Sequence, residues 1–309
     1  MDAPVAPGGY AWWYIDVKSD DGRHALSFIA FVGSVFSPYY ARGRRRRPTA
    51  PPIAEDHSAV NVALYRPEGD RWALTERSRG ALHRSKDSLS IGDSSIAWED
   101  EAIVARFSEK CSPFGQPLSG QLRLEPQRWD GRAIALSGDD AHRWWPIAPL
   151  ARAEVRLDQP ALGFSGQAYL DANHGHEPLE AGFRRWSWAR LSTADSAVIV
   201  YDAHTRDGVR RTLARRYDPS GLVELSPASL RPRALRRTGW GLAQELLVDP
   251  GTAVEVERPL EDTPFYARTS LLASVGGVRG SGVQETLSLD RFEKPWVQAL
   301  LGFRIRRAR

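Results

Sequence analysis

Two short strand-like motifs, YLD at residues 169–171 and HRW at residues 142–144, carry the residue types best suited to chemistry. In a β-strand, residues i and i+2 point to the same face, so Tyr169 lies with Asp171 and His142 lies with Trp144. An aspartic acid and a histidine can both donate or accept protons near aromatic rings. The alternative is an ordinary strand with a solvent-facing polar side and a packed His–Trp pair.

The strand that carries Asp171 has one polar face and one apolar face. Its polar face holds every second residue, namely Ser165, Gln167, Tyr169, Asp171 and Asn173. Strands that are sequential in the chain pair in about two-thirds of cases, so we expect this strand to meet the one that carries His142. On the functional interpretation, the polar face lines a ligand cavity inside a barrel.

The turn that follows, with His174, His176 and Glu177, has the residue types of a metal site. Two histidines at i and i+2 with a carboxylate nearby can ligate zinc. The Gly- and Pro-bearing turn and the lack of an HExxH motif favour a structural role, and we predict no metal. GxSxG, Walker and GxGxxG motifs are also absent, which excludes the common hydrolase, nucleotide and dinucleotide classes.

The sequence contains 11 tryptophans, and five are candidates for a substrate-binding wall. These are Trp12, Trp13, Trp145, Trp186 and Trp188. Packing in a β-protein core is the alternative explanation for each of them. A cavity that holds a long apolar substrate, or that stabilises a carbocation against ring faces, needs the same residue type.

Short alternating runs of β-branched and aromatic residues, separated by Gly, Pro, Asp and Ser, continue along the chain. They predict an all-β protein of antiparallel strands, with helical turns only near residues 264–266 and 295–301. So many strands in 309 residues favour two barrels or sandwiches over one. Aromatic strand starts at 9–14 and 182–188, and Ser-Gly pairs at 165–166 and 281–282, suggest duplication. We place the domains at 1–178 and 179–309.

The composition, 42% hydrophobic and 26% charged, is that of a folded, soluble chain. No apolar run approaches the ~18 residues of a membrane-spanning helix, and MDAPVAPGGY lacks the features of a signal peptide. The single Cys111 excludes an internal disulfide. We therefore predict a cytoplasmic protein, and leave open peripheral contact with the inner or intracytoplasmic membrane.

Arginine supplies almost all of the positive charge, and it is concentrated in two patches. Arg44–Arg47 lies beside a Pro-rich stretch, so we expect it on an exposed loop. Residues 303–309 form a second patch that is basic and partly apolar. No nucleic-acid-binding signature accompanies them, which favours an anionic membrane surface over nucleic acid as the partner.

Five long motifs together closely resemble the acyclic carotenoid 1,2-hydratases, also called hydroxyneurosporene synthases, of phototrophic bacteria. The similarity runs from residue 7 to the C-terminus, and it is weakest in the loops at 44–56 and 226–237. The motifs are Pro7–Tyr40, Asn61–Arg77, His142–Pro149, Tyr169–Arg190 and Glu293–Arg304.

The resemblance implies two lipocalin-like β-barrels in tandem and an enzyme of the hydro-lyase class. The implied reaction is hydration of the terminal 1,2 double bond of neurosporene, lycopene and similar carotenoids to 1-hydroxy carotenoids, with no organic cofactor or metal. In that family a His-x-Trp and a Tyr-x-Asp are regarded as catalytic. By position, these are His142, Trp144, Tyr169 and Asp171 here.

Hydration of an unactivated alkene begins with protonation of carbon, so we assign Asp171 as the acid, kept neutral by an apolar pocket. Trp144 and Tyr169 would stabilise the tertiary cation by ~0.5–2 kcal/mol each. His142 either orients Asp171 or accepts a proton from the attacking water. The alternatives are a non-catalytic carrier of an apolar ligand, a two-barrel enzyme with a pericyclic reaction, and a zinc enzyme.

Overall fold

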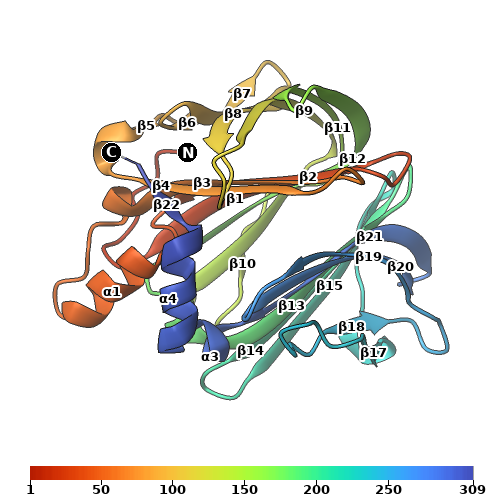
Figure 1. Ribbon diagram of the computed structural model, residues 1–309. Coiled ribbons are helices and arrows are strands. Elements are labelled where there is room, and N and C mark those ends of the chain that lie inside the picture. The colour runs from red at the N-terminus through yellow and green to blue at the C-terminus, as the bar shows by residue number, and fades with distance from the viewer. Residues whose placement is uncertain (309) are drawn as a thin grey trace. The chain divides into compact units, whose positions relative to one another are not determined.

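The computed structural model describes residues 1–308 and groups them into two compact units (Figure 1). Unit 1 comprises Met1–Pro178 and the described residues from Gln298 onward, and unit 2 comprises Leu179–Val297. The two-domain organisation stays a proposal. The first boundary between the units follows Pro178, as expected, but the residues from Gln298 onward belong to unit 1 and not to unit 2. Arg309, the last residue of the predicted basic patch, lies outside the described residues.

Within residues 1–308, unit 1 is built on one 13-stranded sheet, ordered β22-β4-β3-β2-β1-β12-β11-β9-β8-β7-β6-β5, with β10 paired to β11. All its pairs are antiparallel except β22 with β4. The strands are β1 (Tyr10–Ser19), β2 (Ala25–Val32), β3 (Ser58–Tyr65), β4 (Arg71–Arg77), β5 (Leu82–Arg84), β6 (Ser88–Ile91), β7 (Ser94–Glu99), β8 (Ala102–Lys110), β9 (Pro117–Arg128), β10 (Ile134–Ala135), β11 (His142–Gln159), β12 (Leu162–Gly175) and β22 (Arg306–Arg307).

The sheet of unit 1 curls around an apolar core. Strand β3 contacts β6, and β4 contacts β8, although these strands lie in opposite halves of the sheet. The enclosed core takes apolar side chains from both halves, including Phe28 of β2 and Phe107 of β8. From β12 it takes Ala168, Leu170 and Ala172, which are the even positions of that strand. The apolar face of β12 is therefore the face toward the core.

Unit 2 contains a seven-stranded antiparallel sheet, ordered β16-β15-β14-β13-β21-β20-β19, and the two-stranded sheet β17-β18. It has its own core, to which Leu191, Val200 and Leu271 contribute. The predicted all-β, lipocalin-like fold class is confirmed. The strands are β13 (Phe183–Ser192), β14 (Ala197–Thr205), β15 (Arg210–Asp218), β16 (Gly221–Glu224), β17 (Arg231–Ala234), β18 (Glu245–Val248), β19 (Glu255–Asp262), β20 (Tyr266–Val275) and β21 (Val278–Ser288).

The described helices are short, and α1 differs from expectation. The segment with Arg44–Arg46 was expected to be a loop, but it belongs to a helix, because Ser37 caps the N-terminus by accepting from the Tyr40 amide at 3.0 Å. Arginines in its last turn also complement the helix dipole. Among the described residues, each helix is too short or too polar to cross a membrane. The helices are α1 (Pro38–Arg46), α2 (Leu179–Gly182), α3 (Leu289–Phe292), α4 (Pro295–Arg304), η1 (Ala54–His57), η2 (Arg79–Ala81) and η3 (Pro227–Ser229).

The two sheets share a strand order, and this order explains why a Ser-Gly pair occurs in both. A four-strand meander, β1–β4 or β13–β16, is followed along the sheet by a closing strand paired to its first member, β12 or β21. A Cβ atom added to Gly166 of β12 would lie 1.8 Å from the Lys18 carbonyl oxygen of β1. One added to Gly282 of β21 would lie 1.8 Å from the Arg190 carbonyl oxygen of β13. Both glycines permit close approach of neighbouring backbones.

We expect Gly166→Ala and Gly282→Ala each to lower the free energy of unfolding by about 2–3 kcal/mol, because backbone atoms must move to admit the methyl group. Urea denaturation measures this change. Gly163→Ala is the matched control in β12, since its added Cβ would lie 3.7 Å from the Val155 carbonyl oxygen, an ordinary contact. Equal stability of the Gly163 and Gly166 variants would contradict the close-approach explanation.

Candidate functional site

Asp171 is the centre of a buried hydrogen-bonded cluster in unit 1. The indole Nε1 of Trp144 donates to Oδ2 of Asp171 at 2.9 Å, and the Tyr169 hydroxyl donates to the same oxygen at 2.8 Å. The Asn173 amide lies 3.4 Å from the other oxygen, Oδ1. Asp171 is 4% exposed, and Tyr169 and Trp144 are fully buried. The structure thus brings together three of the four residues predicted to be catalytic.

Two irregularities in the β11–β12 pairing lie opposite Asp171 and Tyr169 of this cluster. Between the pairs Trp145–Ala172 and Ala148–Leu170, two residues of β11 face Asp171 alone. The next shift, between Ala148 and Ala151, sets two residues of β11 against Tyr169. Each bulge contains a proline, which cannot donate to the ladder and is tolerated at such points. The WPIAP stretch at 145–149 therefore shapes the strand beside the site, since bulges re-aim side chains.

The cluster lies on the opposite side of the sheet from the unit 1 core. Ala168, Leu170 and Ala172 enter that core, so the alternating Tyr169 and Asp171 point away from it. The expectation that this polar face lines the inside of the barrel is therefore wrong, because core side chains fill the curl. The side chains of Tyr169 and Asp171 are nonetheless buried.

His142 is fully buried on the same face as the cluster, between two polar partners. Its Nδ1 lies 2.9 Å from the Tyr10 hydroxyl, and its Nε2 lies 3.0 Å from Oε1 of Glu177. It pairs with Gly175, where an added Cβ would come within 2.8 Å of the imidazole Nδ1. Burial lowers the pKa of His142 below its ordinary value of 6.5, and the nearby Glu177 carboxylate opposes that shift. His142 is therefore a neutral imidazole at neutral pH.

Tyr10 and Glu177, two partners of His142, were not predicted from the sequence as site residues. Glu177 was weighed only as a metal ligand, a role that the sequence did not favour. Tyr10 stacks on Trp12 with ring centroids 4.9 Å apart and on His142 at 5.8 Å. Its only sequence signal was its i, i+2 spacing to Trp12. Glu177 binds His142, and His176 Nδ1 lies 3.4 Å from the Ala141 carbonyl oxygen. Across residues 1–308, no three His, Cys, Asp or Glu side chains are grouped so as to hold a metal ion.

The tryptophans predicted to bind substrate in unit 1 fall on both faces of the sheet. Trp12 is opposite Asn173 and therefore shares the face of Asp171. Trp13 pairs with Ala172 and packs against the core on the other face. Trp145 also pairs with Ala172, is 37% exposed, and donates its indole N–H to the Asp130 carbonyl at 2.5 Å. Of these three, only Trp12 lies on the face of the cluster.

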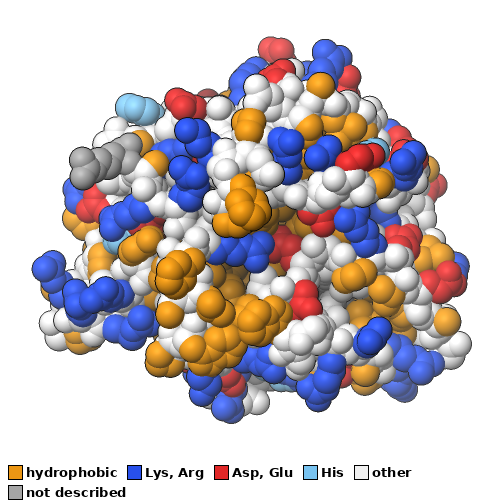
Figure 2. Space-filling view, in the orientation of Figure 1, with side chains coloured by type: hydrophobic (Ala, Val, Ile, Leu, Met, Phe, Trp, Pro, Cys, Tyr) orange, Lys and Arg blue, Asp and Glu red, His pale blue; other side chains and the backbone are white. Residues whose placement is uncertain are grey.

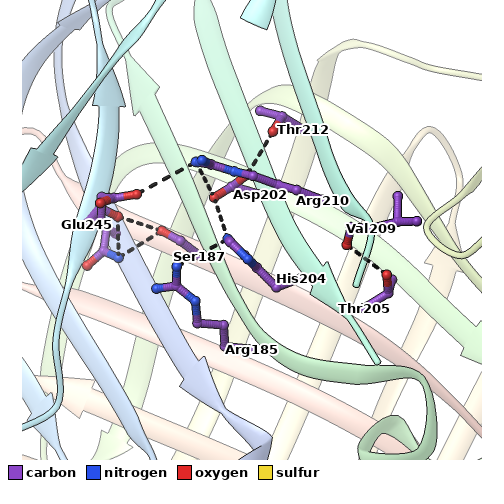
Figure 3. Close-up of polar contacts among 10 residues, drawn as sticks. Arg185, Ser187, Asp202, His204, Thr205, Val209, Arg210, Thr212 and Glu245 are labelled. Atoms are coloured by element: carbon purple, nitrogen blue, oxygen red, sulfur yellow. Dashed lines mark hydrogen bonds and ion pairs between the residues drawn. The ribbon is translucent and has the colours of Figure 1, made fainter. Parts of the chain in front are cut away.

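Trp186 and Trp188 are buried on one face of β13 in unit 2. Trp186 borders a small polar pocket whose contacts are drawn in Figure 3. There Asp202 accepts hydrogen bonds from Arg210 at 2.8 and 2.9 Å and from Thr212 at 2.7 Å. Burial acts to raise the pKa of Asp202, but these hydrogen bonds hold it below its usual range. The carboxylate is thus neutralised by internal partners that tie β14 to β15.

The pKa of His142 makes acid conditions unfavourable for the fold. Because the folded pKa lies below 6.5, the unfolded chain binds the proton more readily, so stability is lost as pH falls from about 6.5 through the folded value. We expect His142→Gln to reduce the loss of unfolding free energy between about pH 7.5 and 5.5. In Glu177→Gln, NMR titration should show a still lower pKa for His142. A rise of that pKa in Glu177→Gln would contradict the assigned partnership.

Comparisons with known proteins bear on the fold and the family of this chain. The family model described as carotenoid hydratase CrtC matches residues 28–309. The acyclic carotenoid 1,2-hydratase of Thiocapsa roseopersicina is 44% identical over 308 residues, covering 99% of this chain and 75% of that protein. The one from Rubrivivax gelatinosus is 42% identical over 309 residues, with the same two coverages of 99% and 75%. A solved structure described as a putative AttH from Nitrosomonas europaea aligns with a TM-score of 0.65 and 16% identity, over 92% of this chain and 98% of that one, and shows the fold alone. The chain belongs to the carotenoid hydratase CrtC family.

Proposed function

We propose that this chain hydrates the terminal 1,2 double bond of acyclic carotenoids such as neurosporene and lycopene, giving 1-hydroxy carotenoids. Its relatives are named for this hydro-lyase reaction. The observation that carries the proposal is the buried Asp171, whose Oδ2 accepts from both Trp144 and Tyr169. A carrier that only binds a hydrocarbon has no use for a buried acid held in this way, because burying such a group costs stability.

We infer that the proton of Asp171 is on Oδ1, because Oδ2 accepts hydrogen bonds at 2.8 and 2.9 Å, whereas the Asn173 amide donates to Oδ1 at the longer distance of 3.4 Å. In a neutral carboxyl group, Oδ2 acts as the carbonyl oxygen and accepts both hydrogen bonds, while Oδ1 carries the hydrogen. Burial favours a neutral carboxyl group in general. The same donors stabilise the carboxylate that forms when the proton leaves, because hydrogen bonds to a charged acceptor are the stronger kind. In this proposal Asp171 is neutral before the reaction and well suited to give up its proton.

The reaction then proceeds in two steps. The Oδ1–H bond breaks, the alkene π electrons form a C–H bond at C2, and a tertiary cation remains at C1. The rings of Trp144 and Tyr169 stabilise that cation by ~0.5–2 kcal/mol each. Water forms the C–O bond at C1 and gives up one proton to His142, and a proton then returns from His142 to the Asp171 carboxylate to restore the acid. The net change is addition of one water molecule, and the chain's own residues supply every proton transfer.

His142 acts in this scheme as the base for the attacking water. It is opposite Gly175, four residues along β12 from Asp171, which is about 13 Å of strand and favours a role other than orienting Asp171. The lowered pKa keeps the ring neutral. Because Nε2 faces the Glu177 carboxylate, Nδ1 is the accepting nitrogen, and it receives the proton through the Tyr10 hydroxyl that lies 2.9 Å away. Glu177 would stabilise the resulting imidazolium across their 3.0 Å contact. The proposed partners are the carotenoid and water. We also propose that the protein is cytoplasmic and contacts an anionic membrane surface, because the carotenoid dissolves in the membrane.

Asp171→Asn should abolish turnover while leaving carotenoid binding intact, because the amide keeps the shape and cannot donate a carboxylic proton. We expect a loss of about 10²–10⁴-fold. The measurement is the mass of the pigment in lycopene-accumulating cells, where wild type adds one water molecule. Binding is followed by the absorption spectrum of protein-bound pigment.

Two further variants serve as controls for this experiment. Tyr169→Phe keeps the acid and removes one of its two donors, so we expect a smaller loss of about 10–100-fold. Asp158→Asn changes an exposed aspartate of β11 and should leave turnover unchanged. Wild-type turnover by Asp171→Asn would refute the assigned acid, and pigment binding without any mass gain by wild type would identify a carrier.

A further inference from the structure

The two most exposed large apolar side chains among the described residues lie on neighbouring segments of unit 1. Phe303, in α4, is 87% exposed, and Phe114, in the turn between β8 and β9, is 82% exposed. The Ser112 hydroxyl donates to the Arg304 carbonyl at 2.5 Å, which ties the two segments together. Gly115 also lies beside Arg306, since an added Cβ would be 3.7 Å from its guanidinium. Two segments that are far apart in sequence therefore present aromatic side chains together.

Leu300 extends this exposed surface along α4. It is 44% exposed and lies three residues before Phe303, so both side chains project from the same side of the helix. On the other side, Leu301 and Ile305 are buried. We call Phe114, Leu300 and Phe303 the apolar ridge. Figure 2 shows hydrophobic side chains gathered on the surface over α4 and Lys and Arg side chains over α1.

Exposed arginines accompany the apolar ridge. Arg307 lies 5.3 Å from the ring of Tyr39, which joins the end of the chain to α1. Beside that contact, α1 and its C-cap carry Arg42, Arg45, Arg46 and Arg47, all exposed. Within residues 1–308, these four and the exposed Arg306 form no ion pair with a carboxylate. We call these five residues the cationic patch.

We propose that the apolar ridge inserts into the acyl boundary of an anionic phospholipid bilayer while the cationic patch binds its headgroups. Exposed apolar patches on a folded protein mark interaction surfaces, and a bilayer interface offers apolar and anionic groups side by side. Arginine can place its charge among headgroups while its stem stays in apolar surroundings. The choice of a membrane partner rests on the proposed function, because a carotenoid substrate dissolves in the bilayer.

The test is flotation of the full chain with vesicles of phosphatidylglycerol and phosphatidylcholine, compared with phosphatidylcholine alone. Wild type should float with the anionic vesicles and less so as salt is raised. Arg45→Ser with Arg46→Ser and Arg47→Ser should weaken binding at low salt. Phe114→Ser with Phe303→Ser should weaken it about tenfold or more at every salt concentration. Equal unfolding free energy of the variants checks that they fold.

Leu300→Ser and Leu222→Ser form a matched pair for this test. Leu222, in β16, is 42% exposed, close to the 44% of Leu300, but lies outside the apolar ridge. We expect Leu300→Ser to weaken vesicle binding and Leu222→Ser to leave it at the wild-type level. Equal binding by the two variants overturns the proposal. The proposal is also overturned if wild type fails to float. If, in addition, wild type self-associates and Phe303→Ser removes that self-association, the surface is a contact between two copies of the chain.

The vesicle test uses no carotenoid, so its outcome is independent of the chemistry. Asp171→Asn should float as wild type does, because Asp171 is buried and outside the apolar ridge. If Asp171→Asn keeps full turnover while the ridge variants lose vesicle binding, the proposed acid is wrong and the docking surface stands. If the ridge variants bind fully while Asp171→Asn loses turnover, the docking proposal alone fails.

Discussion

The paired hydrogen bonds from Trp144 and Tyr169 to a single oxygen of Asp171 are the interaction on which the proposed chemistry depends. A buried carboxyl group without donors would be neutral but a poor acid, because nothing would stabilise the carboxylate left behind. Strong donors on both oxygens would instead favour the charged form from the start. Oδ2 accepts at 2.8 and 2.9 Å, whereas Oδ1 accepts from the Asn173 amide at 3.4 Å, so the proposed chemistry places the hydrogen on Oδ1. In that proposal the asymmetry lets one residue be neutral, oriented and acidic.

The fold of unit 1 supplies this asymmetry through its strand pairing. Strand β12 lies between β1 and β11, so Asp171 has neighbours on both sides. On β1, Tyr14 is directly opposite Asp171, and on β11, Trp144 is opposite Asn173. The bulge opposite Asp171 interrupts the β11 ladder at Pro146. His142 lies further along the same face with Tyr10 and Glu177 as partners. The proposed acid and base thus lie on one continuous sheet face, and their spacing is fixed by strand register.

Period-two alternation was enough to predict that Tyr169 and Asp171 share a face of their strand, and that His142 and Trp144 share a face of theirs. It could not predict which face turns toward the core, because that depends on apolar side chains from distant strands such as Phe107. It also missed the pairing of Tyr10 with His142, which are 132 residues apart. Sequence spacing carries no information on register between such distant strands.

The most direct measurement of the central claim is the infrared spectrum of the purified protein at neutral pH. A protonated carboxyl group has a carbonyl band separate from those of carboxylates, and this band shifts when the hydrogen is exchanged for deuterium. If Asp171 is protonated, wild type shows such a band, the band shifts in D₂O, and Asp171→Asn lacks it. Wild-type and Asp171→Asn spectra that are identical in this region would show that Asp171 is ionised, and would contradict the account.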